Sequence, residues 1–130
     1  MAFNDPIAEL LTKLRNAKNA QHRFVDLGYS KIKIKILDLL KHHGFIENFL
    51  VNEEQHKMRV FLRYTKERGS VLRGLRRESK NGCRRYLGYH NIPRVFNGMG
   101  IAILTTPQGV IDGDTAKNLK VGGEILCTVW

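Results

Sequence analysis

Residues 45–64 read FIENFLVNEEQHKMRVFLRY, and this stretch limits which fold the first half of the chain can adopt. Two runs rich in apolar residues, Phe45–Val51 and Lys57–Tyr64, flank the polar segment Asn52–His56. Runs of this length on either side of a short polar turn are typical of a β-hairpin. The pattern therefore predicts two antiparallel strands joined by that turn.

The segments before the hairpin predict a helix and then a strand. Asp5 is a favourable N-cap, and Pro6 fits the first helical position, where its missing N–H costs nothing. The following residues place apolar side chains along one helical face: Ile7, Leu10, Leu11 and Leu14. Phe24–Leu27 has the composition of a short strand, which ends at Gly28.

Lys31–Ile36 alternates lysine and isoleucine, which is the period of a strand. Its neighbours favour a helix instead, because Ser30 suits an N-cap and Gly44 is a typical stop, with further leucines between them. We interpret the segment as a helix. Helix, strand, helix and hairpin then form a small α/β unit, with the helices packed on the sheet.

Beyond the charged connector Thr65–Gly69, the chain predicts a strand-rich half with glycine-dense loops. Strands are expected at Val71–Arg77, Arg84–Leu87, Ile101–Leu104 and Glu124–Val129, with an Asn81-Gly82 turn between the first two. Short helical turns are expected at Ile92–Val95 and Asp114–Leu119. The predicted fold class is α+β, with an N-terminal α/β subdomain at residues 1–64 and a C-terminal β-rich subdomain at residues 65–130.

The charge of the chain points to a polyanionic partner. Among 130 residues, 22 are Lys or Arg and 12 are Asp or Glu, for a net charge of +10. Both halves are basic, at +4 for residues 1–64 and +6 for residues 65–130. A domain this basic is predicted to bind a polyanion, with nucleic acid as the first candidate and an anionic membrane surface as the second.

The sequence also limits the compartment and the chemistry. No stretch approaches the roughly 20 apolar residues of a membrane helix, and no signal peptide is visible. Cys83 and Cys127 are expected to be reduced thiols in a cytosol-like compartment. Phosphate-loop, nucleophile-elbow and zinc-protease motifs are absent from the sequence. Adjacent histidines, His42 and His43, would point about 100° apart on a helix, which does not suit one metal. We therefore expect a non-enzymatic chain without cofactor or metal.

Positive charge is densest in residues 73–85, where Glu78 is the one acid beside Arg73, Arg76, Arg77, Lys80, Arg84 and Arg85. Arginine forks bind phosphate oxygens bidentately, so the segment predicts contacts to a nucleic-acid backbone. Side chains on a hairpin alternate between its faces, so only some of these arginines can meet one partner.

Two glycine-containing turns add groups suited to RNA. Thr105–Gly109 offers two hydroxyls, the Gln108 amide and a glycine, which suit sugar hydroxyls, base edges and phosphates. The same residues also form ordinary turns. Gly122-Gly123-Glu124 is a second exposed turn, in which the glycines fit a structural hairpin equally well. The Glu124 carboxylate is expected either to accept a hydrogen bond from a base amino group or to fix an arginine.

Over essentially its full length, the chain resembles bacterial-type ribosomal protein eight of the small subunit. The resemblance rests on ordered matches: Asp5-Pro6-Ile7-Ala8, Leu11-Thr12-Lys13-Leu14-Arg15-Asn16, Ser30-Lys31, Gly44-Phe45-Ile46-Glu47, Ile92-Pro93-Arg94-Val95, Gly98-Met99-Gly100-Ile101-Ala102-Ile103-Leu104, Gly109-Val110, and Val121-Gly122-Gly123-Glu124-Ile125-Leu126-Cys127. It implies two subdomains in a structural protein that is a primary binder of the central domain of small-subunit ribosomal RNA and aids assembly. It also implies neighbouring ribosomal proteins as partners and repression of the protein's own operon messenger RNA. The expected location is the cytoplasmic ribosome, although an organelle that encodes its own ribosomal proteins would give a similar sequence.

The resemblance, together with the charge pattern, predicts the RNA-binding residues. Those in the C-terminal half are Thr105, Thr106, Gln108, Gly109, Tyr86, Arg84, Arg85, Arg76, Gly122, Gly123 and Glu124. A second contact surface is expected in the N-terminal half, at Thr12, Arg15, Asn16, Ser30 and Lys31. The chain departs from the usual Ser-Thr-Ser-Lys-Gly loop of the family, because Pro107 lacks a hydroxyl and an N–H and Gln108 lacks a charge. RNA affinity is then expected to depend more on Arg76, Arg84 and Arg85.

Two other functional classes are also considered. A small RNA-processing enzyme would need an acid–base pair or a metal cluster, which the sequence does not display. An interaction module would recruit a protein through exposed aromatic residues such as Phe3, Tyr89 and Phe96.

Overall fold

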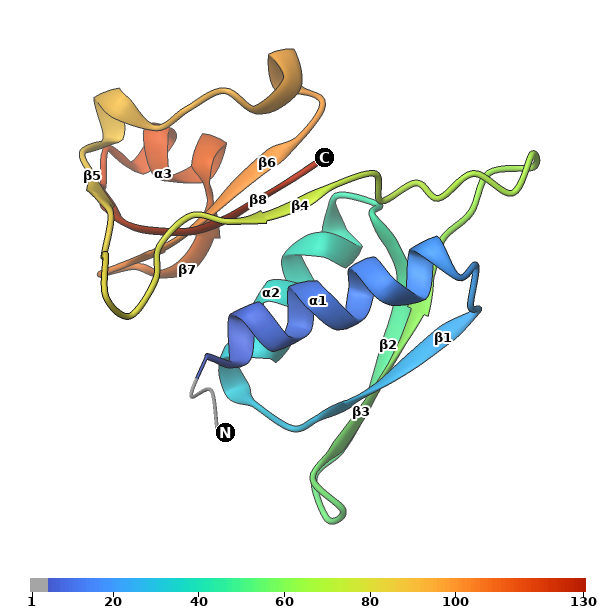
Figure 1. Ribbon diagram of the computed structural model, residues 1–130. Helices are drawn as coiled ribbons and strands as arrows, with labels where there is room; N and C mark the ends of the chain where they lie inside the picture. Colours follow the sequence, from blue (N-terminus) through green and yellow to red (C-terminus); the bar gives the residue numbers. More distant parts are fainter. Residues whose placement is uncertain (1–4) are drawn as a thin grey trace. The chain divides into compact units, whose positions relative to one another are not determined.

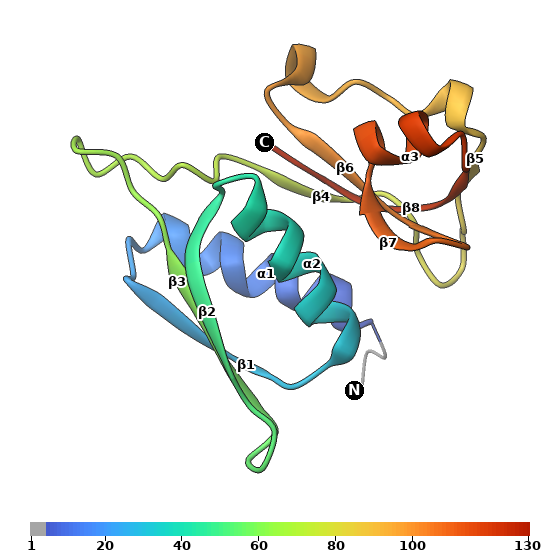
Figure 2. The same cartoon turned by 180° about the vertical axis from the view of Figure 1, so that it is seen from behind.

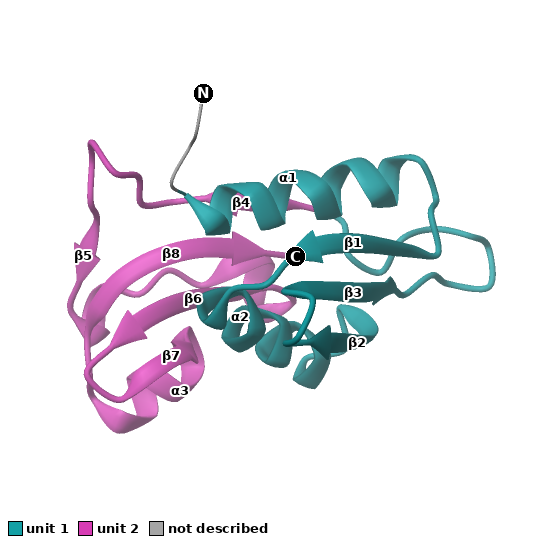
Figure 3. Cartoon of the chain, turned by 90° about the horizontal axis from the view of Figure 1, so that it is seen from below, with its two compact units in different colours: residues 1–73 teal, residues 74–130 magenta. Residues whose placement is uncertain are grey.

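The computed structural model describes residues 5–130, which belong to two compact units. The first unit ends at Arg73 and the second spans Gly74–Trp130 (Figure 3). The sequence predicts a subdomain boundary between Tyr64 and Thr65, whereas the two compact units of the structure divide between Arg73 and Gly74. Residues just beyond Tyr64 still bond within the first unit, since Tyr64 pairs with Ser70 and the Val71 N–H donates to the Arg63 carbonyl.

The described residues of the first unit form two helices and a three-stranded antiparallel sheet (Figures 1 and 2). In chain order, its elements are α1 (Pro6–Asn19), β1 (Phe24–Gly28), α2 (Lys31–His42), β2 (Ile46–Asn52) and β3 (Lys57–Leu62). The strands lie in the order β1-β3-β2, so the hairpin of β2 and β3 is extended by β1 beside β3. The predicted succession of helix, strand, helix and hairpin is confirmed.

Local signals account for both helices. The Asp5 carboxylate accepts the Ala8 N–H at 3.1 Å and Pro6 occupies the first turn, as expected for the start of α1. Ser30 is the N-cap residue of α2, although its side chain makes no capping hydrogen bond. Along β3, buried residues alternate with exposed ones, which directs one face of the sheet toward the apolar sides of both helices. The core of this unit includes Leu10, Leu14, Ile36, Leu40 and Val60.

The second unit consists of an antiparallel sheet and one short α-helix. Its elements are β4 (Leu75–Arg77), β5 (Tyr86–Leu87), η1 (Tyr89–Asn91), η2 (Val95–Gly98), β6 (Ile101–Thr106), β7 (Gly109–Asp112), α3 (Gly113–Leu119) and β8 (Gly123–Val129). The strand order is β4-β8-β6-β7, and β5 also pairs with β8. A core cluster of Ile92, Ala102, Leu104, Ala116 and Ile125 joins the sheet to α3. The α+β class is confirmed.

The strands in the basic segment are shorter than expected and pair differently. Asn81 and Gly82 do form a turn, closed by the bridge between Lys80 and Cys83. However, β4 and β5 do not form a hairpin with each other, because both pair with β8 along the same edge. The seven-residue strand β8 offers a complete row of backbone groups, which the short segments on either side of the turn use in succession.

The helical turn expected at Ile92–Val95 is displaced. Short 3₁₀ helices occur on either side, at Tyr89–Asn91 and Val95–Gly98. Between them Ile92 is extended, with φ −68° and ψ 123°. Pro93 explains this, because a proline ring disfavours the helical conformation in the residue before it. None of the helices in residues 5–130 is long and apolar enough to cross a membrane.

Candidate nucleic-acid interface

Three of the residues predicted to bind RNA form one row across the sheet of the second unit. Tyr86 in β5 is paired with Glu124 in β8, and Glu124 is also paired with Thr105 in β6. Directly paired residues in an antiparallel sheet carry their side chains on the same face. The structure therefore brings together an aromatic ring, a carboxylate and a hydroxyl that are separated by as many as 38 positions in the chain.

One member of this row, Tyr86, is well exposed and suits contact with a partner. The Tyr86 side chain is the prominent one, since 71% of this residue is exposed. Thr105 is half-buried at the end of β6, and the Glu124 side chain is only 13% exposed. An exposed ring next to polar groups that are held by a sheet can stack on an unpaired base while its neighbours form hydrogen bonds.

The Thr105–Gly109 segment is the tip of the β6–β7 hairpin. The Thr106 hydroxyl donates to the Gly109 carbonyl at 2.9 Å and accepts the Gln108 N–H at 3.1 Å. Gly109 has a φ of +109°, a conformation in which a glycine is strongly favoured. The Thr106 hydroxyl thus holds the turn in shape, while Thr105 belongs to the row with Tyr86.

Gly122 and Gly123 allow neighbouring strands to approach β8 closely. A Cβ atom on Gly122 would overlap the carbonyl oxygen of Leu87, and one on Gly123 would overlap that of Thr105. Gly122 and Gly123 therefore have a structural role, which is to allow close packing of the backbones of neighbouring strands. They position β5 and β6 on either side of Glu124.

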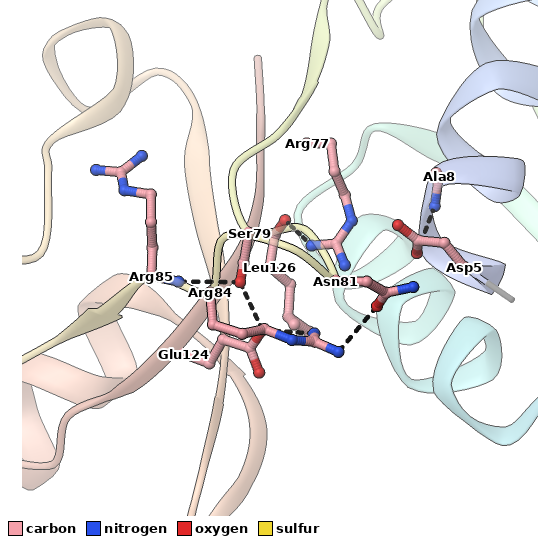
Figure 4. Close-up of polar contacts among 9 residues, drawn as sticks. All are labelled: Asp5, Ala8, Arg77, Ser79, Asn81, Arg84, Arg85, Glu124 and Leu126. Carbon is pink, nitrogen blue, oxygen red and sulfur yellow. Dashed lines mark hydrogen bonds and ion pairs between the residues drawn. The ribbon is translucent and has the colours of Figure 1, made fainter. Parts of the chain in front are cut away.

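The Glu124 carboxylate is the centre of a polar network (Figure 4). Its Oε2 accepts hydrogen bonds from the Ser79 hydroxyl at 2.6 Å and from Arg84 Nη1 at 2.9 Å. Burial raises the pKa of Glu124, but the hydrogen bonds from Ser79 and Arg84 outweigh it and leave the pKa below its usual value. Of the two roles considered for this carboxylate, the structure contains the one that fixes an arginine.

The arginines of residues 73–85 do not form one surface. Glu78, with a side chain 9% exposed, binds Arg85 Nη1 at 2.6 Å and approaches Arg76 Nε at 3.7 Å. It also accepts the Thr128 hydroxyl at 3.0 Å. Arg84 and Arg85 consequently point in different directions (Figure 4). The expectation that RNA affinity depends more on Arg76, Arg84 and Arg85 stays a prediction.

Strand register explains this division. The pairing of β6 with β8 shifts between Ile103, which faces Cys127, and Leu104, which faces Ile125. Such a bulge places an extra residue in β8, so side chains on either side of it change faces relative to simple alternation. Thr128 and its partner Arg76 thus lie on one face, and Glu124 and its partner Tyr86 lie on the other.

A sequence profile described as ribosomal protein S8 matches residues 5–130, and so covers both units. The chain belongs to the ribosomal protein S8 family. Proteins named small ribosomal subunit protein uS8 are similar to it over nearly their whole length. The protein from Protochlamydia amoebophila is 45% identical, with all of both chains covered. Those from Chlamydia felis and Chlamydia trachomatis are 50% and 51% identical, with 98% of this chain and 97% of theirs covered.

The remaining predicted residues of this S8-family chain lie in the first unit. Thr12, Arg15 and Asn16 are spaced three and four positions apart on α1, so they share a helix face, on which Thr12 and Asn16 are exposed. Ser30 and Lys31 lie at the start of α2. Two residues that matter for the network around Glu124, Ser79 and Asn81, were not predicted, because the contact between Ser79 and Glu124 spans 45 positions.

The aromatic residues considered for an interaction module are partly engaged within the S8-family fold. The Phe96 ring stacks on Trp130 with centroids 5.2 Å apart, and Tyr89 packs against the core cluster. Phe3 lies outside the described residues. Among the described residues, no group of three or more His, Cys, Asp or Glu side chains is arranged to hold a metal ion.

Proposed function

We propose that the chain is a structural, non-catalytic component of the small ribosomal subunit that binds ribosomal RNA through the second unit. The observation that carries this proposal is the row of Tyr86, Glu124 and Thr105 with Arg84 beside it, in a chain of net charge +10. Family membership and the names of the relatives support the same assignment. The chain would then act in the ribosome of a bacterial cytoplasm.

The proposed contact combines shape, stacking and charge. The exposed Tyr86 ring would stack on an unpaired or splayed base, and the Thr105 hydroxyl would bond a sugar or base edge. The Gly109 backbone and the Gln108 amide at the tip of the β6–β7 hairpin would approach the RNA closely. Arg84 would contact a phosphate. This arrangement suits an irregular RNA helix better than a uniform duplex, because a uniform helix exposes few base edges to stack on.

The specific target we propose is the central domain of small-subunit ribosomal RNA. Binding there would order the RNA early and so aid assembly of the subunit. The predicted group on the first unit, Thr12, Arg15, Asn16, Ser30 and Lys31, would supply a second contact surface. Its exposed members, such as Lys31, suit phosphate and sugar contacts.

Binding to two RNAs tests the specific contact. Changing Thr106→Val and Gly109→Val together should open the hairpin tip, because it removes both Thr106 hydrogen bonds and the residue suited to φ +109°. We expect this variant to lose much more affinity for a central-domain transcript than for a random duplex of equal length. Equal losses on both RNAs would contradict recognition by this loop, and failure of the wild-type chain to sediment with small subunits would contradict the whole assignment.

We further propose that the same surface represses translation by binding a messenger RNA that mimics the ribosomal site. The resemblance to the family is the support for this step. A competition experiment tests it: the operon leader should displace the central-domain transcript from the wild-type chain. Simultaneous binding of both RNAs to one chain would contradict a shared surface.

A further inference from the structure

Two acidic residues lie within the basic segment of the second unit and its partner strand, and each holds a different arginine. Glu124 binds Arg84 at 2.9 Å, and Glu78 binds Arg85 at 2.6 Å. The two carboxylates are among the less exposed charged groups of the unit, with side-chain exposures of 13% and 9%. Adjacent arginines are thus held by separate anchors.

Arg84 is held at both ends of its guanidinium group. Its Nη1 donates to Glu124 and its Nη2 donates to the Asn81 side-chain oxygen, each at 2.9 Å. A guanidinium has five N–H donors, so these two bonds leave others available to a partner. The side chain is still 43% exposed. An arginine that is already oriented loses less rotamer entropy when it binds a phosphate.

The anchors also determine the direction of each arginine. Glu124 shares a face with Tyr86 and Thr105, and therefore draws Arg84 toward the proposed RNA surface. Glu78 bonds to Thr128, which lies on the opposite face because of the bulge in β8. Figure 4 shows the Arg84 and Arg85 side chains leaving the chain in different directions. Although Arg84 and Arg85 are adjacent in sequence, their side chains are therefore separated in space.

We propose that Glu124 is a positioning residue that directs Arg84 toward an RNA phosphate, and that Glu78 holds Arg85 away from this contact. The inference rests on the proposed function, and it assigns the phosphate contact to one arginine of an adjacent pair. Glu124 is then required for binding although it carries the same sign of charge as the RNA. The hydrogen bonds from Ser79 and Arg84, which lower its pKa, keep the anchor ionised at neutral pH.

The adjacent arginines provide a matched pair of variants. We expect Arg84→Gln to lower the log-log slope of binding against salt by about 0.9, the value that one phosphate contact contributes on a duplex. Arg85→Gln, which removes the same charge one residue away, should leave that slope unchanged. The probe is a transcript of the central domain of small-subunit ribosomal RNA. Equal decreases of the slope in both variants would overturn the assignment.

In the Glu124→Gln variant, the direction of the change in RNA affinity distinguishes two roles of the carboxylate. If the carboxylate acted only through its charge, its removal would strengthen binding to an anionic partner. Because it positions Arg84, we expect binding to weaken instead, on the order of fivefold, the equivalent of one hydrogen bond. Glu78→Gln is the control, and should leave affinity unchanged or increase it. Tighter binding by Glu124→Gln would contradict the proposal.

A double variant separates positioning from direct contact. In an Arg84→Gln background, Glu124→Gln should cause no further loss of affinity, because the arginine that it orients is gone. A further loss would mean that Glu124 touches the RNA itself, and would overturn the proposal. Asn81→Ala removes the other anchor at an exposed turn, away from the core, and should weaken binding in the same Arg84-dependent way.

These outcomes can be distinguished from failure of the proposed function. If the wild-type chain bound the transcript no better than a random duplex, RNA recognition by the second unit would itself be wrong. If the wild-type chain binds specifically while Arg84→Gln behaves like wild type, only the positioning inference fails.

Discussion

Gly123 lies so close to the backbone of Thr105 that a Cβ atom at position 123 would overlap the Thr105 carbonyl oxygen. The overlapped atom belongs to the backbone of β6, which is paired with β8 and cannot rotate away as a side chain would. The close approach of β6 and β8 next to Glu124 therefore requires glycine, which has no side chain, at position 123.

Gly123→Ala should destabilise the second unit and displace the row of Tyr86, Glu124 and Thr105. We expect a loss of about 2 kcal/mol or more in the free energy of unfolding, as for an overpacked core site. Gly88→Ala is the control, because a Cβ there meets nothing within 4 Å and φ is an ordinary −72°. Urea unfolding of both variants measures the difference, and similar stabilities would disprove the close approach.

The two cysteines should differ strongly in reactivity. Cys83 is exposed, whereas Cys127 is fully buried in β8 and burial raises the pKa of its thiol to about 12. A pKa that high leaves only about one thiol in ten thousand ionised at about pH 8, and the thiolate is the reactive form. Titration with a thiol reagent should therefore show one fast equivalent, which Cys83→Ser removes. A second equivalent should react only on unfolding, so two fast thiols in the folded chain would contradict this burial.

Lys33 should matter more for stability than a typical helix-surface lysine. Its side chain is 3% exposed, and its ammonium donates to the Gly28 carbonyl at 3.2 Å and lies 3.3 Å from a Glu9 carboxylate oxygen. Lys33→Ala should cost about 2 kcal/mol in unfolding free energy, because it removes buried contacts and leaves the carbonyl without this donor. Lys33→Met, which keeps the apolar stem, should cost about half as much.

Lys13 provides the comparison for Lys33. It pairs with the same Glu9 at 3.8 Å, but its side chain is 45% exposed. Lys13→Ala should therefore change stability by no more than about 0.5 kcal/mol. Equal losses of unfolding free energy from Lys13→Ala and Lys33→Ala would show that burial does not strengthen the contact between Lys33 and Glu9.

Acid should weaken the second unit partly through Glu124. Its folded-state pKa is below the usual 4.5, so the ionised carboxylate stabilises the fold above the unfolded value. This contribution is lost as pH falls below about 4.5 and through the lower folded-state pKa. Between about pH 5 and about pH 3, wild type should therefore lose more unfolding free energy than Glu124→Gln. Parallel pH profiles would contradict the link between this carboxylate and stability.

Local patterns were sufficient for the first unit. Asp5 and Pro6 indicate the start of α1, and the polar turn Asn52–His56 indicates the hairpin. Lys31–Ile36 was ambiguous by alternation alone, and its flanking signals correctly favoured a helix. These features depend on residues within a few positions of one another, which is the range over which backbone propensity, capping and turn chemistry act.

The α+β class, the helices α1, α2 and α3 and the β2–β3 hairpin follow from the amino-acid sequence alone, which also indicates the turns that carry polar groups. Strand β7, the second strand of the β6–β7 hairpin, was not predicted. In contrast, the row of Tyr86, Glu124 and Thr105 and the different anchors of Arg84 and Arg85 exist only in the folded chain. Both features arise on folding, because the register between strands that are distant in sequence determines which residues become neighbours. The pairing of β4 with β8 joins residues 50 or more positions apart, and the bulge in β8 depends on its pairing with β6 across 19 to 28 positions. A local pattern of side chains contains no signal for either.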